Sequence, residues 1–290
     1  MSLSKVSVAK VVPTDIAEFL LESAEFHEKN AFIEDDPIRL PHQFNKLQDI
    51  EIIGFIVACI SWGNRKSIIR SGEFLITLMD NSPYDFIVNA ESNDLKKMQG
   101  FVHRTFNGID LVYFCEFLQQ HYKKYISLES AFYEEAWKID TQKTDSMNVS
   151  KFNKRIDMDV ESQTLEPIEK ALINFRDYFF AQPHPSRTEK HISSVLKNSA
   201  CKRLNMFLRW MIRKNSPVDF GFWNHFNPKD LYLPLDVHVL RVANQLNLIE
   251  GDVANWQTCK DITALMRTIL PSDPVKLDFA LFGIGIEQKS

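Results

Sequence analysis

The spacing of apolar residues predicts helices along nearly the whole chain. From residue 13 to about 29, apolar side chains recur every three or four positions after a Pro-Thr-Asp start. The segment DIEIIGFIVACIS (49–61) is apolar on almost every face, which predicts a buried central helix. Asn64 then follows a glycine at a helix break, and residues 65–79 resume with an amphipathic pattern.

The later part of the chain continues in the same way, with polar or proline-rich breaks between the periodic segments. Further helical patterns cover residues 82–90, 93–98, 110–122, 128–137, 167–180, 199–214, 236–248, 255–270 and 274–282. Two prolines in segment 35–44 predict a loop there, and Asn107-Gly108 predicts a turn. Residues 139–163 are polar and unpatterned, which predicts a long loop or insertion. The pattern as a whole predicts an all-α fold.

Composition limits the classes of protein to consider. The 290 residues are 44% hydrophobic and 25% charged, as expected for a soluble chain with an ordinary core. A net charge of −4 provides no general attraction for polyanions, so any nucleic-acid site must be a local basic patch.

The cysteines and the hydrophobic runs exclude several kinds of site and location. Four scattered cysteines without any C-x-x-C motif predict reduced thiols and exclude a clustered zinc or iron–sulfur site, so we expect no metal and no cofactor. No run of about 18 apolar residues is present, and the N-terminus lacks the apolar core of a signal peptide. We therefore expect a cytoplasmic protein without membrane association.

The stretch from residue 199 to residue 248 carries the candidate chemistry. It begins with SACKRLNMFLRWMIRK, a basic helical segment without any acidic residue. Lys202 lies near its start, where backbone N–H groups can bind phosphate, and Arg203 is a neighbouring cation that could activate a lysine amine as a nucleophile. The alternative is that Lys202 is a solvated side chain flanking an apolar helix face.

A carboxylate begins the second half of this stretch. Asp236 precedes an amphipathic helix, and its simplest role is that of an N-cap. An N-cap carboxylate is also held ionised and fixed in direction, so capping and chemistry are compatible. His238, two residues later, is either a structural hydrogen-bonding residue or part of the same site.

These residues carry a resemblance to a known superfamily. LPLDVHVLRVANQLNL (233–248) resembles the V-D-T-H-x-x-R-V-x-x-R-L-G-L signature of the helix-hairpin-helix DNA glycosylases of the endonuclease III superfamily. The resemblance makes Asp236 the catalytic aspartate and Lys202 the matching nucleophile. The separation of these two residues is similar to that in archaeal 8-oxoguanine glycosylases. The chain also resembles a bacterial family of similar length, itself uncharacterised, that shares the segments GNRK (63–66), SACKRLNMFLRWMIR (199–213), PLDVH (234–238) and DPVKLDFALFGIGI (273–286).

Two departures from the superfamily pattern concern the backbone near the site. The hairpin motif L-P-G-V-G corresponds to LKNSACK (196–202), which contains no glycine, and Val237 replaces the threonine of the signature. The C-terminal four-cysteine cluster is also absent.

The resemblance implies a single domain, residues 1–290, with lobes formed by 45–215 and by 1–44 plus 216–290. It implies a monomer that excises a damaged base from double-stranded DNA, with or without AP-lyase activity. The DNA-contacting candidates are Lys197, Ser199, Arg203, Trp62, Asn64 and Arg65. Candidates for the base pocket are His42, His103, Arg104, Phe106 and His238, with Phe106 stacking on the base.

Two other functions fit the same sequence. A nucleic-acid-binding protein on this scaffold would bind DNA in a salt-dependent manner without requiring Asp236. A helical protein unrelated to DNA would use its basic helix for a different phosphate-bearing ligand and show no salt-dependent duplex binding.

Overall fold

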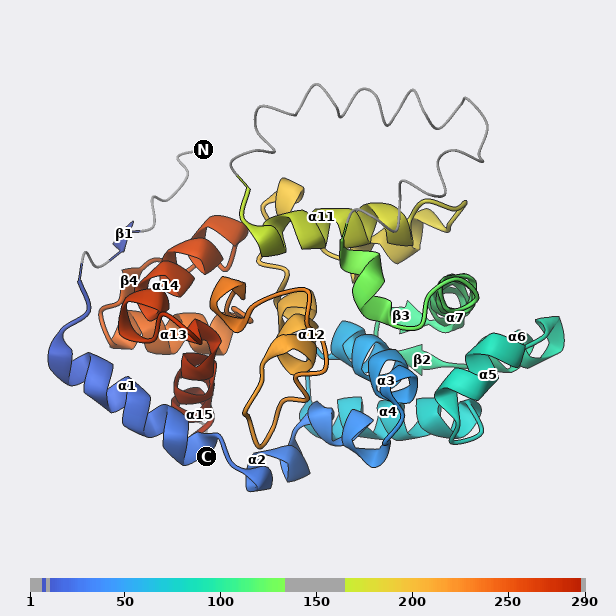
Figure 1. The fold of residues 1–290 in the computed structure, drawn as a ribbon, viewed down its shortest axis with the longest axis horizontal. Coiled ribbons are helices and arrows are strands. Elements are labelled where there is room, and N and C mark those ends of the chain that lie inside the picture. Colours follow the sequence, from blue (N-terminus) through green and yellow to red (C-terminus); the bar gives the residue numbers. More distant parts are fainter. Residues whose placement is uncertain (1–6, 9–10, 134–164, 288–290) are drawn as a thin grey trace.

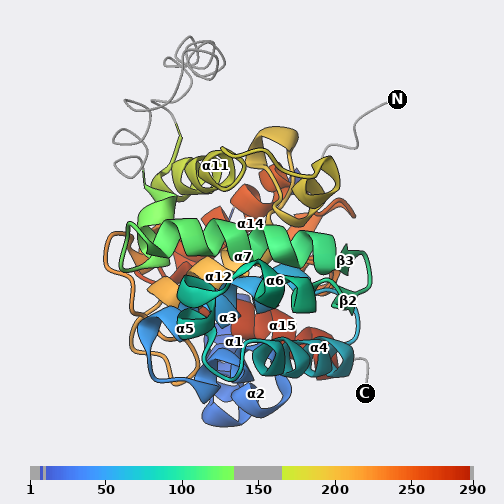
Figure 2. The same cartoon turned by 90° about the vertical axis from the view of Figure 1, so that its right-hand side faces the viewer.

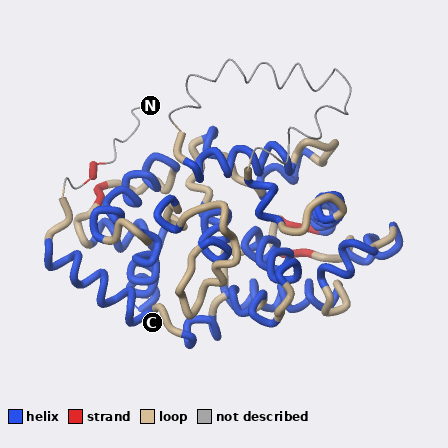
Figure 3. Tube along the Cα trace, viewed as in Figure 1, coloured by secondary structure: helices blue, strands red, loops and turns tan. Residues whose placement is uncertain are grey.

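The computed structural model describes residues 7–8, 11–133 and 165–287, and these are mostly helical (Figure 1; Figure 3). The predicted all-α class is confirmed. The predicted insertion at 139–163 lies outside the described residues. Two antiparallel pairs of very short strands complete the described secondary structure: β1 (Ser7–Val8) with β4 (Ile249–Glu250), and β2 (Val102–His103) with β3 (Phe106–Asn107).

Helix α3 (Leu47–Ile60) is the centre of the fold. Every residue from 50 to 60 is buried, as the all-round apolar pattern predicts. The helix packs against α12 (Lys202–Ile212), α4 (Arg65–Leu78) and α5 (Pro83–Asn89). Because α12 lies directly on α3, the start of α12 is held by the most buried part of the molecule.

One acidic residue, Glu51, lies within this apolar helix and is fully buried. Its carboxylate accepts four hydrogen bonds, from Tyr122 Oη, Ser127 Oγ, the Leu128 amide and Trp223 Nε1, at 2.5 to 3.0 Å. Burial raises the pKa of Glu51, and the four donors act in the opposite direction. Glu51 therefore joins α3 to three segments that are distant in sequence.

One group of helices surrounds α3 on its outer side (Figure 1; Figure 2). It comprises α4, α5, α6 (Ser92–Met98), α7 (Gly108–Tyr122), η3 (Leu128–Phe132) and α11 (Pro167–Phe179). The chain then passes through η4 (Ser186–His191) and η5 (Val195–Lys197) into α12.

A second group contains both ends of the described chain. Helix α1 (Thr14–His27) packs along α15 (Asp278–Glu287), which also packs on α13 (Val237–Gln245). Helix α14 (Trp256–Ile269) and η7 (Pro274–Leu277) complete this group. In Figure 1 the second group lies at the left and the α3–α7 group at the right, with α12 between them.

Two local predictions were wrong in detail. Segment 35–44 is not an irregular loop: it follows α2 (Asn30–Asp35) and forms two short 3-10 helices, η1 (Pro37–Arg39) and η2 (Pro41–Gln43). Both contact α3, so residues 37–43 pack with the first group of helices.

The predicted turn at residues 107–108 is the other error. Asn107 instead caps α7 through its side chain, and the chain reverses at residues 104–105, between β2 and β3. An Asn-Gly pair suits a helix start as well as a turn, because both use the asparagine side chain to accept a backbone N–H.

Candidate functional site

Lys202 and Asp236 are brought together from different helices. Lys202 Nζ lies 3.6 Å from Asp236 Oδ2, and the two side chains retain 28% and 19% of their exposure. Lys202 is the first residue of α12, and Asp236 is the N-cap of α13. An amine and a carboxylate at this distance, both partly open to solvent, can act on the same atom of a ligand.

The direction of the Asp236 carboxylate is fixed by the backbone of α13. Its Oδ1 accepts hydrogen bonds from the amides of His238 (2.8 Å) and Val239 (3.1 Å). The other oxygen, Oδ2, faces Lys202. Asp236 is therefore a true N-cap, and capping leaves one oxygen for the pair.

Lys202 is positioned by the turn that precedes α12. Asn198 and Cys201 both have positive φ angles, 55° and 48°, in the left-handed region that glycine usually occupies. The Trp256 amide donates to the carbonyl of Asn198, and Ser199 forms an isolated bridge with Asn255, so the turn packs against the start of α14. Two residues of this turn, neither of them glycine, therefore adopt the left-handed conformation.

Two arginines of the basic segment, Arg209 and Arg213, are buried and paired with acids from elsewhere in the chain. Arg209 pairs with Asp219 (3.3 Å) and Asp278 (2.5 Å), and both of its partners are buried. Arg213 pairs in the same way with Glu28, Asp219 and Asp273. The partners lie at the C-cap of α1, in the 213–236 connection, at the N-cap of η7 and at the start of α15, so none of them belongs to the basic segment itself.

Two buried acids near the pair were not identified from the sequence. Asp36, which caps η1, and Asp278, which begins α15, are 7% and 5% exposed. Burial raises the pKa of both carboxyls, whereas the positive charge of Lys202 lowers it. Both acids therefore lie within electrostatic reach of the candidate site. In the sequence, the signal for such acids was the seven-residue spacing of Lys202 and Arg209, which places both cations on one face of a helix.

Arg203 does not face solvent as expected for a phosphate contact. Its guanidinium donates to the carbonyls of Cys59 (2.6 Å) and Lys190 (3.1 Å) and lies 5.0 Å from the ring centre of Trp62. It therefore ties the start of α12 to the end of α3. Of the other predicted phosphate contacts, Lys197 is exposed and Ser199 is half-buried.

The turn at residues 62–65 lies beside this start of α12. Trp62 packs against the rings of His103 and His191, and Asn64 caps α4 by accepting the Ser67 amide. Gly63 has a φ of 95°, and a Cβ at this position would come within 2.5 Å of Arg104 Nη1. The exposed Arg104 thus lies against the turn, while the Arg65 guanidinium lies over the ring of Phe282 of α15.

The candidates for a base pocket do not gather in one place. Phe106 is fully buried and packs on Phe101, Phe114 and His191, so it belongs to the core and cannot stack on a ligand. His103 is also buried; its Nδ1 lies 2.9 Å from Ser71 Oγ, and burial lowers its pKa.

The other two histidines are more accessible. His42 Nε2 lies 2.8 Å from the Val218 carbonyl oxygen, and its ring packs on Phe220. His238 is half-buried beside Gly285 of α15, next to Asp236.

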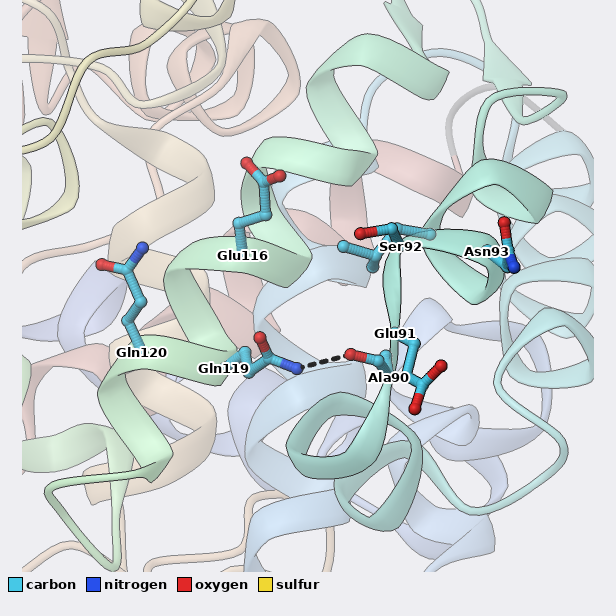
Figure 4. A pocket seen from close by; sticks show the side chains of 8 residues that line it. Ala90, Glu91, Ser92, Asn93, Glu116, Gln119 and Gln120 are labelled. Atoms are coloured by element: carbon cyan, nitrogen blue, oxygen red, sulfur yellow. Dashed lines mark hydrogen bonds between the residues drawn. The ribbon is translucent and has the colours of Figure 1, made fainter.

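A hollow in the described surface lies away from the pair. It measures about 600 Å³ and is formed by α5, α6 and α7, with polar side chains such as Glu91, Glu116 and Gln120 around it (Figure 4). None of its lining residues belongs to α12 or α13. An open polar depression of this kind does not have the apolar walls typical of a small-molecule site.

The described ranges were also informative on metal ligands, membrane-spanning helices and cysteines. No group of three or more His, Cys, Asp or Glu side chains in them is placed to hold a metal ion. No helix in these ranges has the length and apolar character needed to span a bilayer. The four cysteines are buried and unpaired.

The fold and the site together define an all-helical protein with a partly exposed lysine–aspartate pair at the starts of two helices. The chain belongs to a family described as a protein of unknown function (DUF2400), which it matches over residues 36–287. The matched range includes both members of the pair. No curated protein and no solved structure matched the chain.

Proposed function

We propose that the protein is a DNA glycosylase with AP-lyase activity, in which Lys202 is the nucleophile and Asp236 the supporting carboxylate. The observation that carries this proposal is the 3.6 Å separation of Lys202 Nζ and Asp236 Oδ2 in two partly exposed side chains. The resemblance of residues 233–248 to the glycosylase signature supports the same assignment.

The chemistry follows from the two groups. A damaged base would be flipped out of the duplex so that its sugar reaches the pair. The Lys202 amine would form a bond to C1′ while the glycosidic bond breaks and leaves its electron pair with the base. Loss of a proton from the new C–N group and opening of the sugar ring would give a Schiff base. The ionised Asp236 would stabilise the positive charge that develops on the sugar.

The surroundings of the pair supply contacts for a duplex. Exposed basic residues at two neighbouring turns, Lys197 before α12 and Arg104 beside Gly63, can neutralise phosphates without a positive net charge. Arg203 follows Lys202 in α12, and its guanidinium contacts the ring of Trp62 in the turn beside Gly63. Both turns are therefore connected to Lys202.

Borohydride trapping tests the proposal. The full chain is mixed with duplexes containing 8-oxoguanine, uracil or an abasic site, and borohydride reduces any Schiff base to a stable adduct. We expect an adduct with wild type, none with Lys202→Gln, and a loss of about a hundredfold or more in rate with Asp236→Asn.

A second lysine provides the matched control. Lys260 Nζ of α14 lies 3.3 Å from Glu169 Oε1 of α11, and this similar lysine–carboxylate pair is remote from Lys202 in the sequence. Lys260→Gln should trap as well as wild type. An adduct that persists in Lys202→Gln would refute the nucleophile assignment. Salt-dependent duplex binding without base release or adduct on any duplex would favour the binding protein instead.

A further inference from the structure

Asp278 is an unusual buried acid next to the candidate site. It is the first residue of α15 and is 5% exposed. Its Oδ2 accepts from Arg209 Nη1 at 2.5 Å, but its Oδ1 has no hydrogen-bond partner within the described part of the chain. A buried acceptor without a partner costs stability, so its presence requires a reason other than the fold.

The ion pair with Arg209 connects the helices that carry Lys202 and Asp236. Arg209 follows Lys202 by seven residues, two turns along the same face of α12. Asp278 lies on α15, which packs along α13, and Arg241 of α13 donates to the Gly285 carbonyl of α15 at 2.7 Å. The Arg209–Asp278 contact therefore fixes the position of α12 relative to the α13–α15 pair.

Asp278 is also coupled to the candidate site by charge. Burial raises the pKa of Asp278 to about 6. The charged groups around it come from three segments: Arg209 and Lys202 of α12 lower the pKa, while Asp236 of α13 and Asp219 of the preceding connection raise it. A buried group that titrates close to neutral pH beside a reactive pair is typical of functional sites.

We propose that Asp278 is a positioning residue for the Lys202–Asp236 pair. Through Arg209 it holds Lys202 at its distance from Asp236, and its charge acts on the Lys202 amine. The catalytic part of this inference rests on the proposed function, whereas the coupling of Asp278 to Lys202 is independent of it.

A titration of the Lys202 amine tests the coupling without DNA. Lysines of the full chain are methylated with isotopically labelled formaldehyde and followed by NMR, with the Lys202 signal assigned from Lys202→Arg. We expect a step in its chemical shift near pH 6 in wild type. The step should vanish in Asp278→Asn and remain, at a lower pH, in Asp219→Asn, which removes a different buried acid from the same arginine.

Two results of this titration would overturn the proposal. One is a Lys202 signal without any step near pH 6 in wild type. The other is a step that survives in Asp278→Asn and disappears in Asp36→Asn, which would assign the coupling to the other buried acid.

Single-turnover trapping tests the catalytic part. Asp278→Asn should slow adduct formation by roughly tenfold or more with unchanged duplex affinity, because a small displacement of the amine suffices to lower the rate. Asp219→Asn should retain the wild-type rate, and equal slowing of both variants would contradict a specific role for Asp278. If wild type forms no adduct with any duplex, the proposed function fails, and the titration still decides the coupling.

Discussion

Replacing Asp278 by asparagine should change how the stability of the fold depends on pH. The pKa of Asp278 rises from 3.8 to about 6 on folding, because the carboxyl is buried. Between these values the folded state binds more protons than the unfolded state, so stability decreases as the pH rises. A difference of roughly two pKa units, at about 1.4 kcal/mol each, makes the ionised Asp278 cost about 3 kcal/mol above pH 6.

Urea denaturation of wild type and Asp278→Asn at several pH values between 4 and 8 measures this cost. Asparagine resembles the protonated acid, so the variant lacks the pH-dependent term. We expect it to gain about 2 kcal/mol on wild type from pH 4 to pH 7, or about 4 °C in melting temperature for a chain of this size. A constant difference between the two proteins, or one that favours wild type at higher pH, would refute the reasoning.

Asp94 provides a control of opposite sign. Its hydrogen bond from Lys97, followed by one from the backbone at Glu91, lowers the pKa of this exposed carboxyl. A lowered pKa contributes stability above the unfolded value that is lost as the pH falls through the folded one. Asp94→Asn should therefore lose stability relative to wild type as the pH rises, in contrast to Asp278→Asn.

The pH dependence of stability and the rate of trapping, measured together in Asp278→Asn, separate a role in function from a role in folding. A residue that only stabilises the fold would lower both stability and activity when replaced. Replacing Asp278 removes a partner of the buried Arg209, which lowers stability at every pH, but the raised pKa of the Asp278 carboxyl makes this loss smaller as the pH rises. Trapping that stays slow at the higher pH, where the loss of stability is smallest, would show that the buried charge acts on the pair and not only on the fold.

Two other replacements test buried polar contacts. Glu51→Gln places an amide donor among four donors and should lower the free energy of unfolding, measured in urea, by about 2–4 kcal/mol. The same change at Glu129, which accepts one backbone amide, should lower it by about 1 kcal/mol. If Glu51→Gln leaves stability unchanged, Glu51 is protonated in the folded protein. Arg203→Met should cost about 2 kcal/mol by removing its carbonyl contacts and leave the salt dependence of duplex binding unchanged. Lys197→Met, at an exposed position, should instead lower the slope of log K against log salt by about 1, and a reversed pattern would restore Arg203 as a phosphate contact.

The sequence by itself determined the helices and the identity of the pair. Periodicity placed the starts of α3, α4 and α11 within two residues, because amphipathic and buried patterns are local properties of a helix. The N-cap role of Asp236 could be predicted for the same reason, since a cap depends only on the residues that follow it. The expected meeting of Lys202 and Asp236 came from the motif, and the structure places them 3.6 Å apart.

Only the tertiary structure decided what surrounds the pair. The partners of Arg209 lie 10 and 69 residues away, so a segment that appears basic in the sequence is neutralised by acids from other elements. Phe106 is buried for a related reason, because its ring meets Phe101, Phe114 and His191 only after the chain has folded. Asp278 acquires its raised pKa in the same way. Burial and long-range charge depend on which helices pack together, and no local pattern records that packing.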